Sequence, residues 1–423
     1  MTTPTFRHPR LACLFAVMGL VIALAGCGGP GTREGVTIMV PWTQPHEFQA
    51  FYGLVKDFER STGIPVDVQV TRDLTQQLDA SVQAGVPPDL AVLPSAAAVI
   101  RYADTTTANG GRLRSLDKTV DIADYQQPFR GLAQVHGVTY AVPVKVDVKS
   151  LVWYDEQASG APDDDATWRS VTGQTDLTWC LGLESGPTSG WPGADWIADL
   201  LLSGAGADTY EQWVSGELPW TSKPVRQAWS DWAESVGRKV LKGAGRRGFV
   251  AATGELAESS PTCRLAHGAR SGLAPALQKD SRFTFAAPDA GRPIEVSGDF
   301  VGMFSAHNPG ARRFVSYLAG ARAQQAWVDA AGSAAFSAHR QVTDYAHPVR
   351  QRIAGMLRSR EHTLCFSAAD AMSPDVAAAF FSTVLDYADG SEDPGTLLGN
   401  LQQVQEKLGG TGVPRQSICA IPT

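Results

Sequence analysis

The chain has 423 residues, of which 43% are hydrophobic and 19% charged, and its formal net charge is −7. This length suffices for two packed lobes. The acidic balance disfavours a nucleic-acid backbone or an anionic membrane leaflet as the partner, but it carries no information about a neutral ligand.

The N-terminal segment predicts export. Basic residues precede an apolar run from Leu11 to Leu24, which ends in two small residues followed by Cys27. A run of about 14 residues is too short to span a bilayer but is typical of a signal peptide, and the small residues before the cysteine form a bacterial lipobox. We therefore expect residues 1–26 to be a lipoprotein signal peptide and residues 27–35 a tether, with a diacylglycerol on the Cys27 thiol. The alternative is an ordinary signal peptide followed by an incidental cysteine.

The next segment has the pattern of an α/β lobe. Apolar runs predict strands over residues 36–42 and 89–93, and strict alternation of apolar residues predicts another over residues 64–70. Helical spacing of apolar residues predicts helices over residues 47–61 and 74–84. Strand and helix thus alternate as in a parallel sheet with helices on both faces.

The rest of the chain predicts a second lobe reached by crossing strands. Residues 137–154 are continuously β-like, as expected for a strand that passes directly from one lobe into another, and residues 159–165 are polar and predict a loop. Residues 299–306 predict a return strand. Helical patterns occur at 191–202, 208–215, 223–242, 311–331, 346–358, 374–388 and 394–408.

Several short motifs resemble those of a known family. They are Trp42, Phe58-Glu59, Thr62-Gly63-Ile64, Pro87-Pro88-Asp89, the Gly-x-x-Tyr-x-x-Pro segment from Gly137 to Pro143, and Gln325-Ala326-Trp327. In this order they resemble the extracellular solute-binding proteins of ABC sugar importers, the maltose-binding-like group. A second set resembles the α-glucoside-type branch of that group, namely Glu184-Ser185-Gly186, Gly190-Trp191-Pro192 and Asp195-Trp196.

The resemblance implies a periplasmic-binding-protein-like fold with two α/β lobes and a ligand cleft between them. Lobe 1 would comprise residues 36–147 plus 302–340, and lobe 2 residues 148–301 plus 341–423. The implied function is to capture a carbohydrate, such as an oligosaccharide α-glucoside, by lobe closure and to deliver it to the membrane permease subunits. The implied protein is a monomer on the extracellular face of the cell membrane, without a cofactor.

Sugar sites need aromatic rings for the apolar face of the ligand, and charged or amide groups for its hydroxyls. If a helix begins near Pro192, Trp191 and Asp195 both lie near its start. The candidates for ligand contact are Trp42, Arg72, Asp73, Lys145, Glu184, Trp191, Asp195, Trp196 and Asp299. For each of them, core packing, helix capping or a surface turn is the alternative role.

Four cysteines remain after Cys13 and Cys27, and their spacing does not match a zinc site. An even number outside the cytosol predicts two disulfides, and three pairings are possible. We favour Cys180–Cys263 and Cys365–Cys419, because each pair falls within one segment of the proposed lobes.

Two other classes of function remain as alternatives. A ligand-presenting partner of a sensor kinase would have the same fold. A secreted glycan-acting enzyme would need a catalytic constellation, but the sequence has no Gly-x-Ser-x-Gly, His-Glu-x-x-His or phosphate-loop motif. We therefore expect no catalytic residues and no enzymatic activity.

Overall fold

The computed structural model describes residues 35–105, 110–158, 168, 171, 178–279, 281–408, 413–414 and 418–423. The expected signal peptide, Cys27 and the loop at 159–165 lie outside these residues. None of the helices in the described part combines the length and apolar character needed to cross a membrane. The helices are α1 Pro45–Thr62, α2 Leu74–Gln83, α3 Ala96–Ala103, α4 Phe129–Leu132, α6 Trp191–Val214, α7 Lys223–Val236, α8 Arg238–Ala244, α9 Phe249–Gly254, α10 Pro275–Lys279, α11 Pro309–Ala319, α12 Ala321–Asp329, α13 Pro348–Arg358, α14 Ala368–Ala371, α15 Pro374–Asp389 and α16 Pro394–Leu408. The strands are β1 Val36–Val40, β2 Val66–Val70, β3 Leu90–Leu93, β4 Gln134–Val135, β5 Val138–Thr139, β6 Ala141–Val148, β7 Val152–Asp155, β8 Ala266–His267, β9 Phe283–Ala286, β10 Ile294–Met303, β11 Leu364–Phe366 and β12 Cys419–Ala420.

The first lobe is the α/β unit that the alternating pattern predicts. Strand β1 pairs in parallel with β2 on one side and β3 on the other. Helix α1 ends at Gly63, whose φ of 72° is left-handed, and its amide donates to the carbonyl of Glu59. Phe51 and Phe58 of α1 are fully buried, Phe58 against Phe314 of α11 and Phe51 against Trp327 of α12, so this helix covers one face of the lobe.

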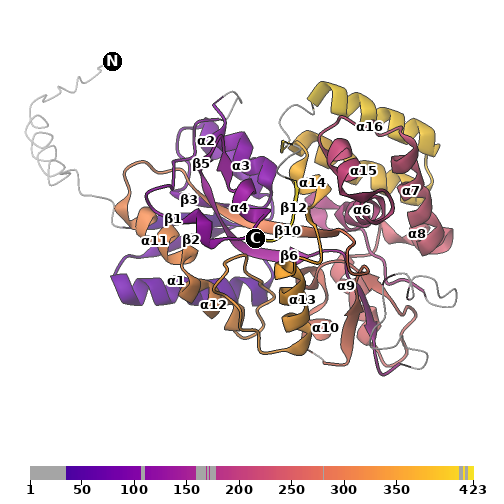
Figure 1. The fold of residues 1–423 in the computed structure, drawn as a ribbon, viewed down its shortest axis with the longest axis horizontal. Helices are drawn as coiled ribbons and strands as arrows, with labels where there is room; N and C mark the ends of the chain where they lie inside the picture. The colour runs from indigo at the N-terminus through magenta and orange to yellow at the C-terminus, as the bar shows by residue number, and fades with distance from the viewer. Residues whose placement is uncertain are drawn as a thin grey trace, which may run out of the picture.

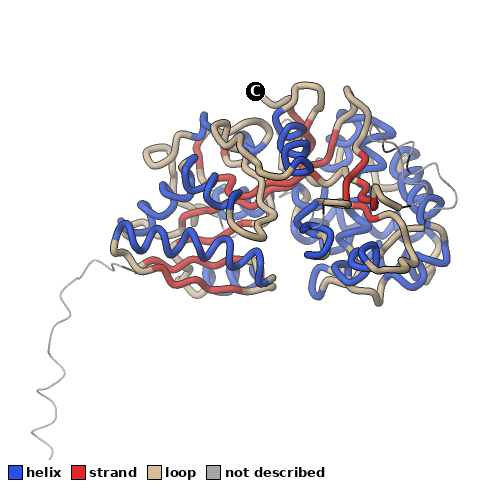
Figure 2. Tube along the Cα trace, turned by 90° about the horizontal axis from the view of Figure 1, so that it is seen from below, coloured by secondary structure: helices blue, strands red, loops and turns tan. Residues whose placement is uncertain are grey.

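Two long antiparallel strands, β6 and β10, join the lobes (Figure 1). Residues 300–303 of β10 pair with β3 in the first lobe, whereas residues 294–296 pair with β11 in the second. One sheet, in the order β12-β11-β10-β3-β1-β2 with β6 beside β10, therefore runs through both lobes. Figure 2 shows these strands as a continuous connection from a perpendicular direction.

The pairing of β10 also bears on where the lobes divide. The boundary expected between residues 301 and 302 falls inside the part of β10 that already pairs with β3. Ser297, Gly298 and Asp299 pair instead with Asp147, Val146 and Lys145 of β6, and the register shifts between Asp299 and Phe300. We propose that the return crossing lies at residues 297–299, slightly earlier than expected.

The second lobe combines a helical layer with a small sheet, β8-β7-β9. Its helical core is aromatic: the rings of Trp213, Trp220 and Trp229 lie within 6 Å of Phe380 on α15. Trp229 also packs edge-on against Tyr387 at 5.0 Å. The tryptophans outside the candidate set are therefore core residues.

Glycines divide three helical segments of the structure. One break agrees with the prediction: the helices predicted at 191–202 and 208–215 are the two parts of α6, which are separated at Gly206, where the backbone angles are non-helical (φ 84°, ψ 170°). The segment predicted at 223–242 is instead two helices separated by Gly237, with φ of 82°. The segment predicted at 311–331 is likewise α11 and α12, separated by Gly320. Continuous apolar spacing hides these last two breaks; at Gly237 the positive φ favours glycine, whereas Gly320 is in an ordinary extended conformation.

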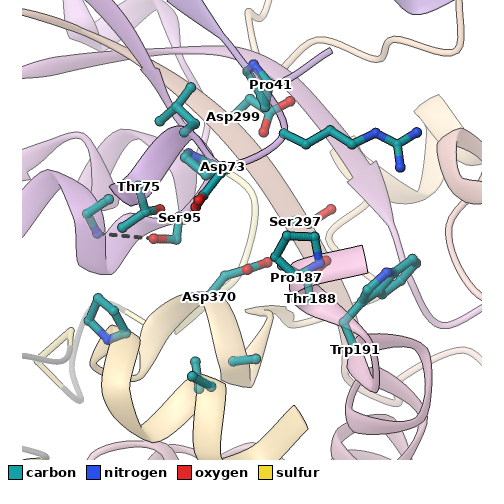
Figure 3. Close-up of a pocket in the computed structure, with 18 of the residues that line it drawn as sticks. Pro41, Asp73, Thr75, Ser95, Pro187, Thr188, Trp191, Ser297, Asp299 and Asp370 are labelled. Atoms are coloured by element: carbon teal, nitrogen blue, oxygen red, sulfur yellow. Dashed lines mark hydrogen bonds between the residues drawn. The ribbon is translucent and has the colours of Figure 1, made fainter. Parts of the chain in front are cut away.

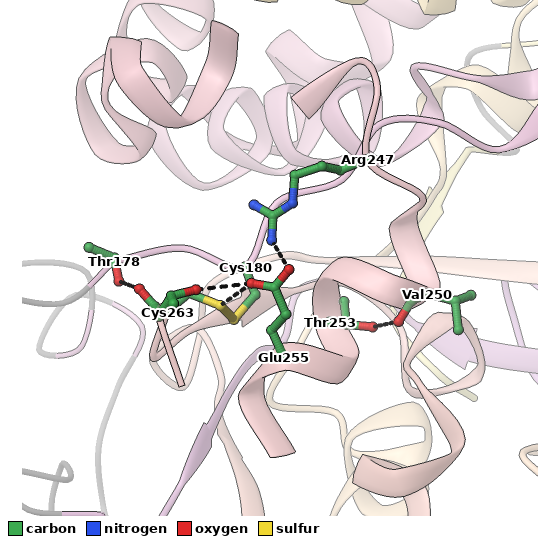
Figure 4. Close-up of a disulfide and its surroundings, with 8 residues drawn as sticks. Thr178, Cys180, Arg247, Val250, Thr253, Glu255 and Cys263 are labelled. Atoms are coloured by element: carbon green, nitrogen blue, oxygen red, sulfur yellow. Dashed lines mark hydrogen bonds and ion pairs between the residues drawn. A yellow bond between two sulfur atoms is a disulfide. The ribbon is translucent and has the colours of Figure 1, made fainter. Parts of the chain in front are cut away.

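The structure has the two disulfides that we favoured. Cys180 and Cys263 are joined across a sequence separation of 83 residues, and Cys365 and Cys419 across 54. The first bridge lies beside Glu255 (Figure 4), whose carboxylate pairs with Arg247 and accepts a hydrogen bond of 3.0 Å from the Thr262 hydroxyl. The second joins β11 to β12 at the edge of the sheet.

Candidate ligand-binding cleft

A cavity of about 970 Å³ lies between the lobes against the crossing strands, within the usual range for ligand sites. Residues after β1, β2 and β3 line it from the first lobe, and the starts of α6, α14 and α15 line it from the second. Figure 3 shows Asp73 and Ser95 on one side, facing Asp370, Thr188 and Trp191 on the other. All the predicted ligand residues except Glu184 and Trp196 line this cavity.

Trp42 lies at the end of β1 with most of its ring in the core. Its side chain packs at 4.9 Å against both Phe51 and Trp327, and only 4% of the residue is exposed. Its indole nitrogen donates a 3.0 Å hydrogen bond to Oδ2 of Asp299 on β10. Trp42 therefore exposes only a small part of its ring to the cleft. Its indole nitrogen fixes the orientation of the Asp299 carboxylate.

Two further groups on β6 form the floor of the cleft. Lys145 Nζ lies 2.6 Å from Glu47 Oε1; burial opposes its charge, but the carboxylates of Glu47 and Asp299 outweigh burial and raise the pKa of Lys145. Burial raises the pKa of Asp147, although its carboxylate accepts a 2.9 Å hydrogen bond from the Ser271 amide. Burial likewise raises the pKa of Asp299, against the effect of Lys145. The floor thus combines acceptors and a cation among buried side chains, where hydrogen bonds to ligand hydroxyls are stronger than in bulk water.

Arg72 and Asp73 lie where β2 ends, beside the end of β1. The carboxyl ends of parallel strands meet at one edge of the sheet, which is where open α/β sheets place ligands. Arg72 Nε donates to the Thr43 hydroxyl at 2.9 Å, and this side chain is exposed. The two residues provide the rim of the first-lobe wall, where Arg72 is exposed and Asp73 half-buried.

Trp191 begins α6 and forms the aromatic part of the second-lobe wall. It follows Gly190, whose φ of 103° is left-handed and where a Cβ atom would lie 2.1 Å from the Phe381 carbonyl oxygen. Only glycine permits this close approach, so Gly190 determines where Trp191 enters the cleft. The Trp191 ring contacts Phe249 edge-on at 4.7 Å, and Lys149 Nζ lies 6.0 Å from its centroid.

A buried lysine organises the carboxylates of the second lobe. Lys149 Nζ lies 2.9 Å from Asp195 Oδ1, 3.0 Å from the Ser367 hydroxyl and 3.4 Å from Asp370 Oδ2. Burial raises the pKa of Asp195 to about 6, although the nearby Lys149 ammonium lowers it. The pKa of Lys149 is raised, because its carboxylate neighbours outweigh the effect of burial. Lys149 was absent from the sequence-based candidates, because no local pattern indicates that the crossing strand brings it to α6 and α14.

The structure does not bring Trp196 to the cleft. It is 2% exposed, stacks on His267 at 4.8 Å and packs edge-on against Trp179 at 4.3 Å. Helix geometry explains the difference: at about 100° per residue, Asp195 lies about 40° from Trp191, but Trp196 lies about 140° away. The spacing could therefore have separated the core tryptophan from the cleft tryptophan.

Glu184 lies beside the main cavity, in an adjoining one of about 410 Å³. Its Oε1 accepts a 3.0 Å hydrogen bond from the Gly186 amide, so it also has the capping role weighed as its alternative. Trp191 and Arg72 line both cavities. The two cavities form one elongated cleft with Trp191 at their junction.

The cleft contains polar residues that the sequence patterns did not indicate, because segments far apart in the chain supply them, several of them helices. They are Asp79, Ser95, Arg101, Lys149, Ser271, Asp370 and Asp375. Within the part of the chain that the structure describes, no group of three or more His, Cys, Asp or Glu side chains is arranged to hold a metal ion.

Two α/β lobes, crossing strands and an interlobe cleft define a two-lobe solute-binding protein. The chain belongs to the family described as bacterial extracellular solute-binding protein, whose model matches residues 53–344. The resemblance drawn from the sequence motifs is therefore confirmed, as is the two-lobe fold.

Two relatives extend over most of the chain. The osmoprotective compounds-binding protein GgtB of Synechocystis sp. (strain ATCC 27184 / PCC 6803 / Kazusa) is 28% identical over 404 residues, which cover 88% of this chain and 94% of that protein. The alpha-glucosides-binding periplasmic protein AglE of Rhizobium meliloti (strain 1021) is 28% identical over 406 residues, 86% of each chain. Among solved structures, a chitin oligosaccharide binding protein matches with a TM-score of 0.73 and 16% identity, covering 89% of this chain and 99% of that one.

Proposed function

We propose that this chain is the lipid-anchored substrate-binding component of an ABC importer, and that it captures a carbohydrate by lobe closure. The observation that carries the proposal is the wall formed by Trp191 and Asp370, which faces Asp73 across the cleft, with Asp195 and Arg72 lining the same cavity. A ring beside carboxylates suits a sugar, whose apolar face covers an aromatic side chain while its hydroxyls donate to the acceptors.

The relatives support a carbohydrate ligand. One is named for binding α-glucosides, and a solved structure with the same fold is a chitin oligosaccharide binding protein. The elongated cleft, with a second cavity beyond Trp191, favours an oligosaccharide such as an α-glucoside over a single sugar ring. Charged acceptors would each contribute about 1.5–3 kcal/mol through hydrogen bonds to ligand hydroxyls.

Closure follows from the way the cleft is built. A ligand that contacts both lobes binds the closed form more tightly than the open form, so it shifts the population toward the closed form. The permease would then recognise the closed form. A solution-scattering measurement should show a smaller radius of gyration at saturating sugar; an unchanged radius would contradict closure.

The experiment for the substrate class is calorimetric titration of the processed chain with maltose, trehalose, maltotriose, chitobiose and single hexoses. We expect α-linked glucosides to bind, and the sugar to be recovered intact. At 100 times Kd the ligand should raise the free energy of unfolding by about 2.7 kcal/mol.

The matched variants are Trp191→Ala and Trp191→Phe. Trp191→Ala should weaken binding at least about tenfold through loss of the ring, whereas Trp191→Phe should retain most of the affinity. Binding of a peptide, polyamine or inorganic anion, with no response to any sugar, would refute the substrate class.

The anchor is tested separately: mass analysis should find a diacylglycerol on Cys27, and Cys27→Ala should release the protein from the membrane.

A further inference from the structure

A second concave surface lies on the first lobe, outside the cleft. It encloses about 680 Å³, and its charged side chains are Lys118, Arg312 and Arg313, with His307 beside them. No aspartate or glutamate is among the described residues that line it. We call Lys118, Arg312 and Arg313 the basic surface; all three are exposed. On a chain of net charge −7, this surface is a local reversal of charge.

The basic surface is held together by specific contacts. Arg312 and Arg313 are the fourth and fifth residues of α11, which Asn308 caps by accepting a 3.2 Å hydrogen bond from the Ala311 amide. Arg312 Nη1 donates to the Thr119 hydroxyl at 2.9 Å, which brings the loop carrying Lys118 alongside the helix.

Two acids lie nearby, and neither cancels the excess of positive charge. Asp57, which acts on Tyr317 at the edge of this surface, is paired with Arg60. Asp117, which precedes Lys118, accepts a 2.9 Å hydrogen bond from the Thr139 amide and keeps its charge, so it offsets only one of the three positive charges. The surface therefore keeps a net positive charge.

The basic surface adjoins the point at which the lobe begins. Asn308 Nδ2 donates a 2.9 Å hydrogen bond to the Gly35 carbonyl, and a Cβ atom at Gly310 would lie 3.1 Å from the Val36 side chain. Figure 1 shows α11 beside β1, in the half of the first lobe that lies away from the second lobe. Gly35 follows Cys27 by only eight positions, and even a fully extended segment of that length reaches at most about 28 Å. A lipid on Cys27 therefore holds this end of the first lobe close to the bilayer.

We propose that the basic surface binds the anionic phospholipid headgroups of the membrane that carries the anchor, an inference that rests on the proposed lipidation of Cys27. Arginine forks and the lysine ammonium both suit phosphate oxygens. The acidic chain as a whole is not drawn to an anionic leaflet. The lipid provides the attachment, and the basic surface determines which face of the first lobe meets the bilayer.

The size of the effect follows from surface electrostatics. Each basic residue near an anionic leaflet adds about a fivefold preference, and the attraction fades within a Debye length of about 8 Å. Three residues give up to about a 100-fold preference for the orientation that places the basic surface on the membrane.

The test uses the lipidated protein with a fluorophore on Ser316→Cys, an exposed position on the rim of this surface. The protein is attached to phosphatidylcholine vesicles with or without 30% phosphatidylglycerol, each containing a lipid-borne nitroxide quencher. We expect strong quenching only with phosphatidylglycerol, and its loss in high salt. The variant K118Q/R312Q/R313Q should lose the dependence on phosphatidylglycerol.

The matched control removes three positive charges elsewhere, from exposed residues of the second lobe, as K239Q/K242Q/R246Q. It should keep the quenching, and both triple variants should keep the sugar affinity of the parent. Equal quenching in the two lipid mixtures, or an equal loss in both triple variants, would overturn the proposal while leaving the anchor intact. A protein that fails to float with neutral vesicles would instead refute the anchor, and the orientation with it; sugar binding would be unaffected.

Discussion

Replacing Lys149 by methionine isolates the contribution of the buried charge cluster in the second lobe. The variant removes the ammonium that lies 2.9 Å from Asp195 and 3.4 Å from Asp370, and it leaves the aliphatic packing in place. Breaking a buried ion pair by removing one partner costs about 3–5 kcal/mol, because the remaining charge is left unpaired. We expect the free energy of unfolding to fall by this amount at pH 8.

The loss should depend on pH because of Asp195. Its folded-state pKa of about 6 lies above the ordinary value of 3.8, so the folded protein binds more protons than the unfolded chain between these values. The free energy of unfolding therefore falls as pH rises through this window. Without Lys149 the pKa of Asp195 rises further, so the variant loses stability over a wider range of pH. At pH 5, Asp195 is largely protonated in both proteins, and we expect less than half of the loss seen at pH 8.

Urea unfolding followed by tryptophan fluorescence at pH 5 and pH 8 measures both effects. Asp195→Asn and the double variant K149M/D195N complete a double-mutant cycle. The double variant should be more stable than K149M alone at pH 8, because no unpaired carboxylate remains at position 195. An equal loss at the two pH values, or additive single effects, would refute the charge-pairing argument.

Three further predictions concern the cleft and the second lobe. Trp196→Ala should cost about 3–5 kcal/mol of stability and leave the sugar affinity of the folded protein within about twofold. Trp191→Ala should instead weaken sugar binding and lower the stability much less. Urea unfolding and titration of the same samples separate the two roles. Gly190→Ala should destabilise the protein by more than the roughly 1–2 kcal/mol of left-handed strain expected for Gly186→Ala, because a Cβ atom at Gly190 meets the Phe381 carbonyl while one at Gly186 meets nothing within 4 Å; equal losses would contradict this. Replacing either disulfide by two alanines should cost about 2–5 kcal/mol, and the two losses should agree to within about 1 kcal/mol, because loop entropy depends only weakly on separations of 83 and 54 residues; a thermal melt of each variant checks it.

The sequence predicted the first lobe well because its signals are local. Alternating valines define β2, helical spacing of aromatic residues defines α1, and Gly63 ends that helix in a left-handed conformation. The same reasoning failed where glycine interrupts an unbroken apolar pattern, as at Gly237 and Gly320. Those breaks depend on how neighbouring helices pack, which the period of apolar residues does not record.

The candidate site was predictable where residues end strands or begin a helix. Trp42 and Asp73 line the cleft because strand ends meet at one edge of the sheet, and Trp191 does so because it begins α6. Asp299 lines it from within β10, where that strand crosses between the lobes. Trp196 was assigned to the cleft by its proximity to Trp191 in the sequence, although its position on the helix directs it into the core.

The sequence by itself thus determined the α/β class, the family resemblance and the residue types suited to a sugar, because these depend on composition, periodicity and short motifs. Only the tertiary structure decided which charges meet. Lys149 reaches Asp195 and Asp370 because β6 and β10 cross between the lobes, and Lys118 joins Arg312 on one surface because Arg312 holds the neighbouring Thr119. Such contacts join residues that can be more than 200 positions apart in the sequence. Because no local pattern encodes the distance between two such residues, only the packing of the whole chain decides whether they meet.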